Sequence, residues 1–206
     1  MTNFRVTGCA LFFLALALVG GVCAPATAQP QIDEPKAARV KAAFVFNFLK
    51  FTRWPKHAFA AADSPIVIAV LGHDPLGPSL DDGVAGKQID GRAVQVRRFA
   101  FPKDDGPSDE KKQARTERLA RQLSRCHLVY VAWPHDDEAA AVLARIDPDT
   151  TLLVADRPAL ARRGAMLALG IDEGRVVIYA NRGAVLASAL KVSSKLLHLA
   201  RSVTKE

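Results

Sequence analysis

Short apolar runs that alternate with helical segments constrain the fold of this chain more than any other feature. Three runs, Pro65–Gly72, His127–Trp133 and Thr151–Asp156, have the length and apolar character of buried strands. Gly91–Phe99 alternates apolar and polar residues, which predicts a strand with one solvated face. Strands that alternate with helices favour a largely parallel sheet covered on both sides, so we expect a single three-layer α/β domain.

The C-terminal part of the chain predicts two further elements. Ala165–Asn181 contains two apolar segments that flank the sequence IDEGR, and Gly174 can adopt the positive φ of a tight turn. This pattern predicts a β-hairpin. Apolar residues at helical spacing over Arg182–Val203 then predict a long closing helix.

The first 28 residues have the pattern of a secretory signal peptide. Arg5 supplies the positive charge, Ala10–Val19 is an apolar core, and Ala26–Ala28 fits the small-x-small cleavage pattern. The apolar core is shorter than the roughly 20 residues of a membrane-spanning helix, although an uncleaved anchor remains the alternative. We therefore expect a signal peptide at 1–28, a polar leader at 29–35 and a folded domain at 36–206.

Charge and cysteine content limit the classes of partner. The chain carries a formal net charge of +7, and removal of Arg5 with the signal peptide leaves +6. An exported basic protein can meet acidic proteins, lipid headgroups or an anionic cell wall, and we expect no nucleic-acid partner. Cys126 is the only cysteine after residue 28, so no internal disulfide is expected in the mature chain. A small core residue is the expected role, and an intermolecular bridge is the alternative.

Aromatic residues concentrate in the stretch FVFNFLKFTRWP. A helix is expected over Lys36–Trp54, ending before Pro55 because a residue that precedes proline is disfavoured in the α region. Phe44, Asn47 and Phe51 share one face of this helix and are expected to be buried together. A helix that is apolar on most sides usually lies within a core.

The alternative interpretation is a partly exposed aromatic strip that another protein contacts. Trp54 and Phe48 are the candidates on this helix, and Trp54 is expected to be half exposed at its end. A second candidate surface is the charged amphipathic helix that follows residue 112, where Arg115, Arg118 and Arg125 fall near one face. A solvated helix face is the alternative there.

Polar residues also follow the predicted strands. His73 and Asp74, His135 and Asp136, and Asp156 each come after an apolar run. If those strands are parallel, all five lie at the carboxyl edge of the sheet, where open α/β folds bind ligands. Histidine and carboxylate together can hold a metal, but helix capping by the aspartates is the competing explanation. We predict no metal and no cofactor.

Two short motifs suggest catalysis but are incomplete. Gly72–Gly77 has the glycine spacing of a phosphate-binding loop, but Pro78 and Ser79 stand where lysine and serine or threonine are needed. Ser188–Lys191 fits Ser-x-x-Lys, but the companion motifs of acylases are absent. We therefore do not expect an enzyme.

Five segments, taken together, resemble the YfiR-like family of periplasmic proteins. They are KAAFVFNFLKFTRWP, IVIAVLGHDPLGPSLDDGVAGKQIDGRAVQVRRF, CHLVYVA, LLVADRPALARRGAMLAL and NRGAVLASALKVSSKLLHLAR. The resemblance extends from Lys36 to Arg201, and the order and spacing of the segments are more specific than any one of them.

This resemblance implies a compact periplasmic regulator. Relatives bind the periplasmic sensor domain of an inner-membrane diguanylate cyclase and hold it inactive, so that cyclic-di-GMP production and biofilm formation depend on release. Family members also self-associate, which makes a homodimer a further expectation. The chain lacks the internal disulfides of some relatives, so redox-gated release is not expected. A periplasmic small-molecule binding module is the alternative function.

Overall fold

The structure, a computed structural model, describes residues 33–101 and 109–204. The predicted signal peptide at 1–28 and residues 29–32 of the predicted leader lie outside the described residues. Across the two described ranges, no helix has the length and apolar character needed to cross a membrane.

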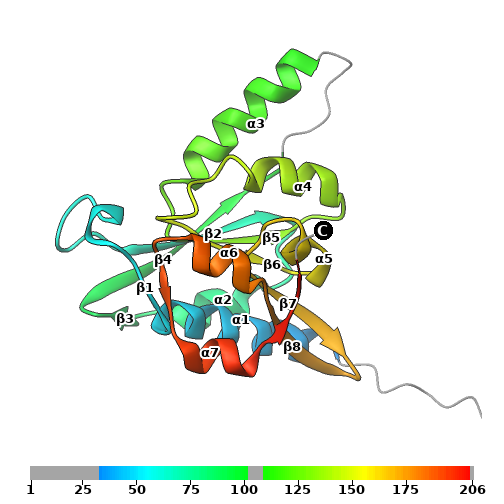
Figure 1. Ribbon diagram of the computed structural model, residues 1–206. Coiled ribbons are helices and arrows are strands. Elements are labelled where there is room, and N and C mark those ends of the chain that lie inside the picture. Colours follow the sequence, from blue (N-terminus) through cyan, green and yellow to red (C-terminus); the bar gives the residue numbers. More distant parts are fainter. Residues whose placement is uncertain (1–32, 102–108, 205–206) are drawn as a thin grey trace, which may run out of the picture.

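An eight-stranded sheet forms the middle layer (Figure 1). Its spatial order is β3 (Gln88–Ile89), β4 (Arg92–Phe99), β2 (Ile66–Gly72), β5 (Leu128–Ala132), β6 (Leu152–Ala155), β7 (Leu167–Asp172), β8 (Arg175–Ala180) and β10 (Arg201–Ser202). The strands from β4 to β7 run parallel, whereas β8 is antiparallel to β7. The parallel part has the doubly wound order 2-1-3-4-5, with its switch point between β2 and β5.

Helices cover both faces of the sheet. They are α1 (Glu34–Lys50), α2 (Gly77–Val84), α3 (Asp109–Leu123), α4 (Asp136–Leu143), α5 (Pro158–Arg162), α6 (Arg182–Ala187) and α7 (Ser194–Leu199), with a 3-10 turn at Lys56–Ala58. The pair α1 and α2 packs on one face, and α3 and α4 lie on the other (Figure 1). The predicted three-layer α/β fold is confirmed.

The predicted strands and hairpin are also confirmed. β2, β5 and β6 have buried residues on both faces, as continuous apolar runs require in a covered parallel sheet. β7 and β8 are joined by Glu173 and Gly174, with φ of 47° and 70°. Two consecutive positive φ values define the turn that matches the twist of a two-residue hairpin.

The aromatic helix is shorter than predicted, and a different face of it is buried. α1 begins at Glu34, with Pro35 in its first turn, and ends at Lys50. Its buried face contains Val45, Phe48 and Leu49, each 0% exposed. The prediction that Phe44, Asn47 and Phe51 are buried together is wrong, because Phe51 is 40% exposed. Apart from Lys41, the buried residues of α1 are aliphatic or aromatic, and Asn47 is only partly buried.

The predicted closing helix over Arg182–Val203 is wrong. This segment instead forms α6, the short strand β9 (Lys191–Val192), α7 and β10. β9 pairs antiparallel with β1 (Thr52–Arg53), and the N–H of Ser193 donates to the carbonyl oxygen of Phe51 at 2.8 Å. Pairing between segments about 140 residues apart therefore overrides the local helical pattern.

Candidate partner-binding surface

Three rings pack together at the amino edge of the sheet. Trp54 follows β1, and its indole Nε1 donates to the carbonyl oxygen of His127 at 3.0 Å. The Trp54 ring meets the imidazole of His127 edge-on, at 6.2 Å between centroids. Phe59 stacks on the same imidazole at 4.5 Å. A buried histidine thus supports two partly exposed aromatic side chains.

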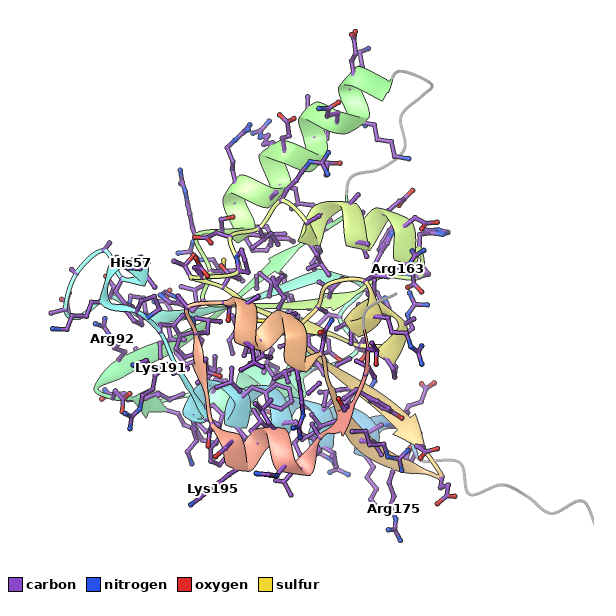
Figure 2. The ribbon with its side chains drawn as sticks, in the orientation of Figure 1. His57, Arg92, Arg163, Arg175, Lys191 and Lys195 are labelled. Atoms are coloured by element: carbon purple, nitrogen blue, oxygen red, sulfur yellow. The ribbon has the colours of Figure 1, made fainter. Side chains whose placement is uncertain are left out.

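Arg92 anchors the loop that carries Phe59. Its guanidinium lies 3.8 Å from the centre of the Phe59 ring, and its Nη1 donates to the carbonyl oxygens of Ala61 and Ser64 at 3.1 and 2.7 Å. Figure 2 shows Arg92 and His57 at the same end of the molecule. The charge-assisted bonds and the cation–π contact hold the loop against β4.

A cavity of about 190 Å³ opens beside these rings, with Thr52, Trp54, Phe59 and Arg92 among its lining residues. Thr52 is 4% exposed, and its hydroxyl oxygen has no hydrogen-bond partner among the described residues. Pockets for drug-sized ligands are usually about 300–1,000 Å³, so this one accommodates no more than a single side chain or ring.

His127 is held as a neutral tautomer. The N–H of Val67 donates to its Nδ1 at 3.1 Å, so the proton of the imidazole resides on Nε2. Nε2 is buried without a hydrogen-bond partner among the described residues. Burial lowers the pKa of His127, and the charge of Arg92 adds to this effect. The Ala58 carbonyl opposes the shift without completing a hydrogen bond to Nε2.

This geometry predicts a pH-dependent stability. The pKa of His127 is lower in the folded than in the unfolded chain, where it is about 6.5. The unfolded chain therefore binds more protons between the two pKa values, and the free energy of unfolding falls as pH drops below about 6.5. Urea unfolding from pH 8 to 5 measures this. His127→Asn keeps an acceptor for Val67 without titrating, and its stability is expected to vary less with pH. An equal pH slope in both proteins would exclude His127 as the cause.

The carboxyl edge holds a buried ion pair. Nζ of Lys41 lies 2.5 Å from Oδ1 of Asp156, and the two side chains are 10% and 17% exposed. The hydroxyl of Tyr130 donates to the same carboxylate oxygen. Burial and the Asp156 charge raise the pKa of Tyr130 well above 10, so the phenol remains a donor at neutral pH.

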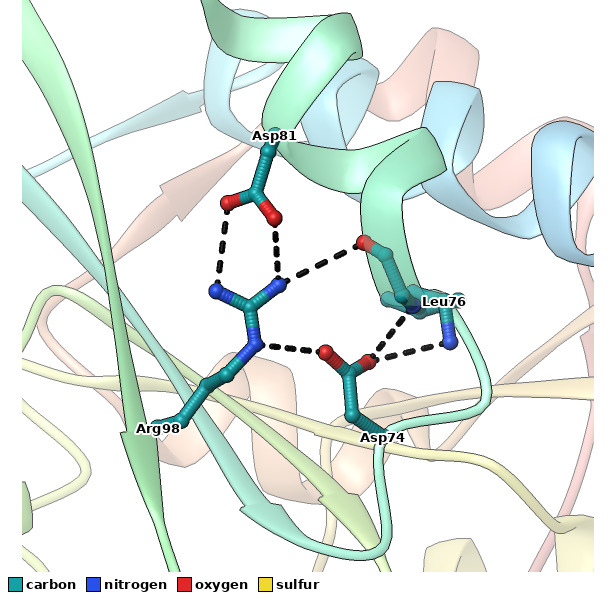
Figure 3. Close-up of polar contacts among 5 residues, drawn as sticks. Asp74, Leu76, Asp81 and Arg98 are labelled. Carbon is teal, nitrogen blue, oxygen red and sulfur yellow. Dashed lines mark hydrogen bonds and ion pairs between the residues drawn. The ribbon is translucent and has the colours of Figure 1, made fainter.

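Asp74 and Asp136 also form ion pairs, each with an arginine. Arg98 donates to Asp74 at 2.7 Å and to both oxygens of Asp81 (Figure 3). Partial burial opposes ionisation of Asp74, but the bonds from Arg98 and from the N–H groups of Gly77 and Leu76 outweigh it and lower its pKa. Asp136 pairs with Arg157 at 2.5 Å.

Three of the five ligand-cleft candidates, the aspartates, are therefore already paired with basic side chains. His73 and His135 are exposed, and no group of three histidine, cysteine or acidic residues within the described ranges could hold a metal. At the switch point, pairing between the chains that leave β2 and β5 continues, because the N–H of His73 donates to the carbonyl of Ala132 at 3.1 Å. A Cβ on Gly72, whose φ is +99°, would lie 2.2 Å from that carbonyl oxygen.

The sequence of the chain matches one known protein family. The YfiR/HmsC-like family matches residues 38–201. The chain belongs to this family. Members of the YfiR/HmsC-like family are periplasmic regulators rather than enzymes. Among curated proteins, none matches the chain.

One solved structure supports the α/β fold of this YfiR/HmsC-like protein. A conserved domain protein from Vibrio cholerae O1 biovar El Tor is similar at a TM-score of 0.51 and 12% identity, over 80% of this chain and 59% of that one. The ABC domain from Streptococcus pneumonia, in complex with L-Trp, gives 0.45 and 11%, over 67% and 56%. This chain spans less than two thirds of either protein.

The sequence candidates for a partner surface separate into two groups. Phe48 leaves the candidate surface, because it is fully buried in α1. Trp54 is half-buried, and Phe51, three residues earlier in the chain, is exposed. Arg118 and Arg125 are exposed on or just after α3, which projects from the body (Figure 1), and Arg115 is half-buried. Leu119 and Leu123 form the buried side of α3.

Sequence reasoning missed Phe59 and Arg92, and found no partner for His127. Phe59 lies in a loop without periodicity, and its contacts are with residues far along the chain.

Cys126 behaves as expected for a core thiol. It is 2% exposed, and burial raises its pKa to about 11 despite the opposing effect of Arg97.

Proposed function

We propose that this protein inhibits an inner-membrane diguanylate cyclase from the periplasm, by binding the sensor domain of the cyclase. The observation that carries the proposal is the family match, which extends over residues 38–201 and so includes nearly all of the described fold. Within the family, regulation of diguanylate cyclase signalling is the common theme. The inhibitory contact itself is the proposal.

The accessible aromatic residues suit a protein partner. Trp54 is half-buried and fixed at its Nε1, so little conformational entropy is lost when another protein covers its ring. Tryptophan and arginine are the residues most enriched where binding energy concentrates. Trp54 is therefore the proposed centre of the contact, together with exposed Arg53, which lines the same cavity.

The cellular test is deletion of the gene for this protein. Loss of the inhibitor is expected to raise cyclic-di-GMP and biofilm formation, and an intact copy supplied in trans is expected to restore both. Unchanged cyclic-di-GMP in the deletion strain, with a membrane-bound cyclase expressed, would count against the proposal.

Substitution of Trp54 tests the proposed contact. Trp54→Ala is expected to weaken binding to the partner by at least about 2 kcal/mol, as for a buried aromatic at an interface centre. Because it also removes the bond to His127, Trp54→Phe is the matched variant that keeps a ring. Partner affinity and melting temperature are measured for both. If Trp54→Ala binds like the wild type, the interface lies elsewhere.

A further inference from the structure

The sheet has an open edge along β4. β3 pairs with β4 only at its start, through Gln88 with Ala93 and Ile89 with Arg92. No strand of the described residues lies on the outer side of β4 from Gln95 to Phe99, at the left end of the sheet in Figure 1. Unpaired backbone groups along such an edge are a template for another strand.

The hydrogen bond of Val94 identifies which groups point outward. Its N–H donates to the carbonyl oxygen of Lys87 at 3.3 Å, on the outer side of β4. Alternate residues of a strand direct their N–H and C=O to the same side, so Val96 and Arg98 also direct theirs outward. The backbone groups of Gln95 and Arg97 instead face β2, the inner neighbour.

The chain that leaves β4 turns away from this edge. Phe101 stacks on Trp133, just beyond β5, at 4.3 Å between ring centres. The chain therefore crosses toward the middle of the sheet within two residues of the end of β4. The next helix along the chain, α3, packs against α4. The described part of the chain thus leaves the outer side of Gln95–Phe99 open.

A second copy of the protein fits this edge poorly. β3 blocks β4 up to Val94, so two copies can pair only within Gln95–Phe99, and antiparallel pairing over this whole segment places the two-fold axis at its middle residue. That residue is Arg97, which would face Arg97 of the other copy in a closely spaced, non-hydrogen-bonded pair. Like charges directly opposite each other are destabilising.

The same residue favours an acidic partner. Arg97 is exposed, and no ion pair between described residues involves it. Arg98 is already neutralised by Asp74 and Asp81. We propose that an extended segment of a partner protein, with a carboxylate opposite Arg97, adds to the sheet as a strand along Gln95–Phe99. This inference depends on the proposed function in one respect, namely that the partner is a protein.

A synthetic peptide tests this edge without the cyclase. The probe is a seven-residue peptide, blocked at both ends, in which glutamate alternates with valine and threonine. Peptide binding is expected to shift the amide resonances of Val96 and Arg98 and to slow their hydrogen exchange. The same peptide with lysine in place of glutamate, and one N-methylated at the amides that would face β4, are expected not to bind.

Protein variants complete the experiment. Arg97→Glu is expected to weaken binding of the acidic peptide about tenfold and to allow the lysine peptide to bind. Arg175→Glu makes the same charge change at the opposite end of the molecule (Figure 2) and is expected to have no effect.

Three results would overturn the proposal. They are no shift at Val96 and Arg98, equal binding of the N-methylated peptide, and shifts that depend on protein concentration without peptide, which would indicate self-pairing. A failed deletion test would contradict the proposed function but leave the peptide result unchanged, so the two failures can be distinguished.

Discussion

Phe48→Ala is expected to lower the free energy of unfolding by about 3–5 kcal/mol, because it empties a ring-sized volume in the core. Phe48 is 0% exposed and lies with Val45 and Leu49 on the face of α1 that packs on the core. Such a loss is a large share of the 5–15 kcal/mol that stabilises a typical domain. Urea denaturation, followed by circular dichroism, measures it.

Phe51→Ala is the matched control from the same stretch of sequence. Phe51 is 40% exposed, so its truncation is expected to cost no more than about 1 kcal/mol. Equal destabilisation by the two substitutions would show that the buried face of α1 is not the one described.

Lys41→Met is expected to destabilise the protein by about 3 kcal/mol. It retains the length and apolar stem of the side chain but leaves the carboxylate of Asp156 buried without its cation. Removal of one partner from a buried pair typically costs about 3–5 kcal/mol, and the partial exposure of Asp156 places this pair at the lower end.

The double variant Lys41→Met, Asp156→Asn isolates the charge effect. Asparagine still accepts from the hydroxyl of Tyr130 but carries no charge, so much of the lost stability is expected to return. Additive losses in the two single variants and the double variant would show that Lys41 and Asp156 are not coupled.

The sheet could be predicted because its signals are local. Each apolar run marks its own strand, and Gly174 marks the hairpin turn without information from elsewhere in the chain. Alternation of strands with helices predicts the parallel sheet, but it does not fix the order of the strands. The C-terminal segment could not be predicted in this way, because Lys191–Val192 pairs with Thr52–Arg53 from the other end of the domain.

The candidate surface depends almost wholly on such distant contacts. Trp54 was identified from its place at the end of an aromatic helix, but its support by His127 brings together residues 73 positions apart. Phe59 and Arg92 contribute through ring stacking that leaves no pattern in the sequence. The aspartates follow the strands as the sequence predicts, but the sequence does not indicate that Lys41 pairs with Asp156 or Arg98 with Asp74.

Addition of the purified protein to spheroplasts tests the central claim most directly. The exported protein is purified from the periplasm and added to spheroplasts of the deletion strain, whose inner membrane exposes its periplasmic face. A fall in cyclic-di-GMP that depends on protein concentration, and that Trp54→Ala reduces, is the result predicted for inhibition by contact. Unchanged cyclic-di-GMP at saturating protein, in spheroplasts with an active cyclase, would contradict it.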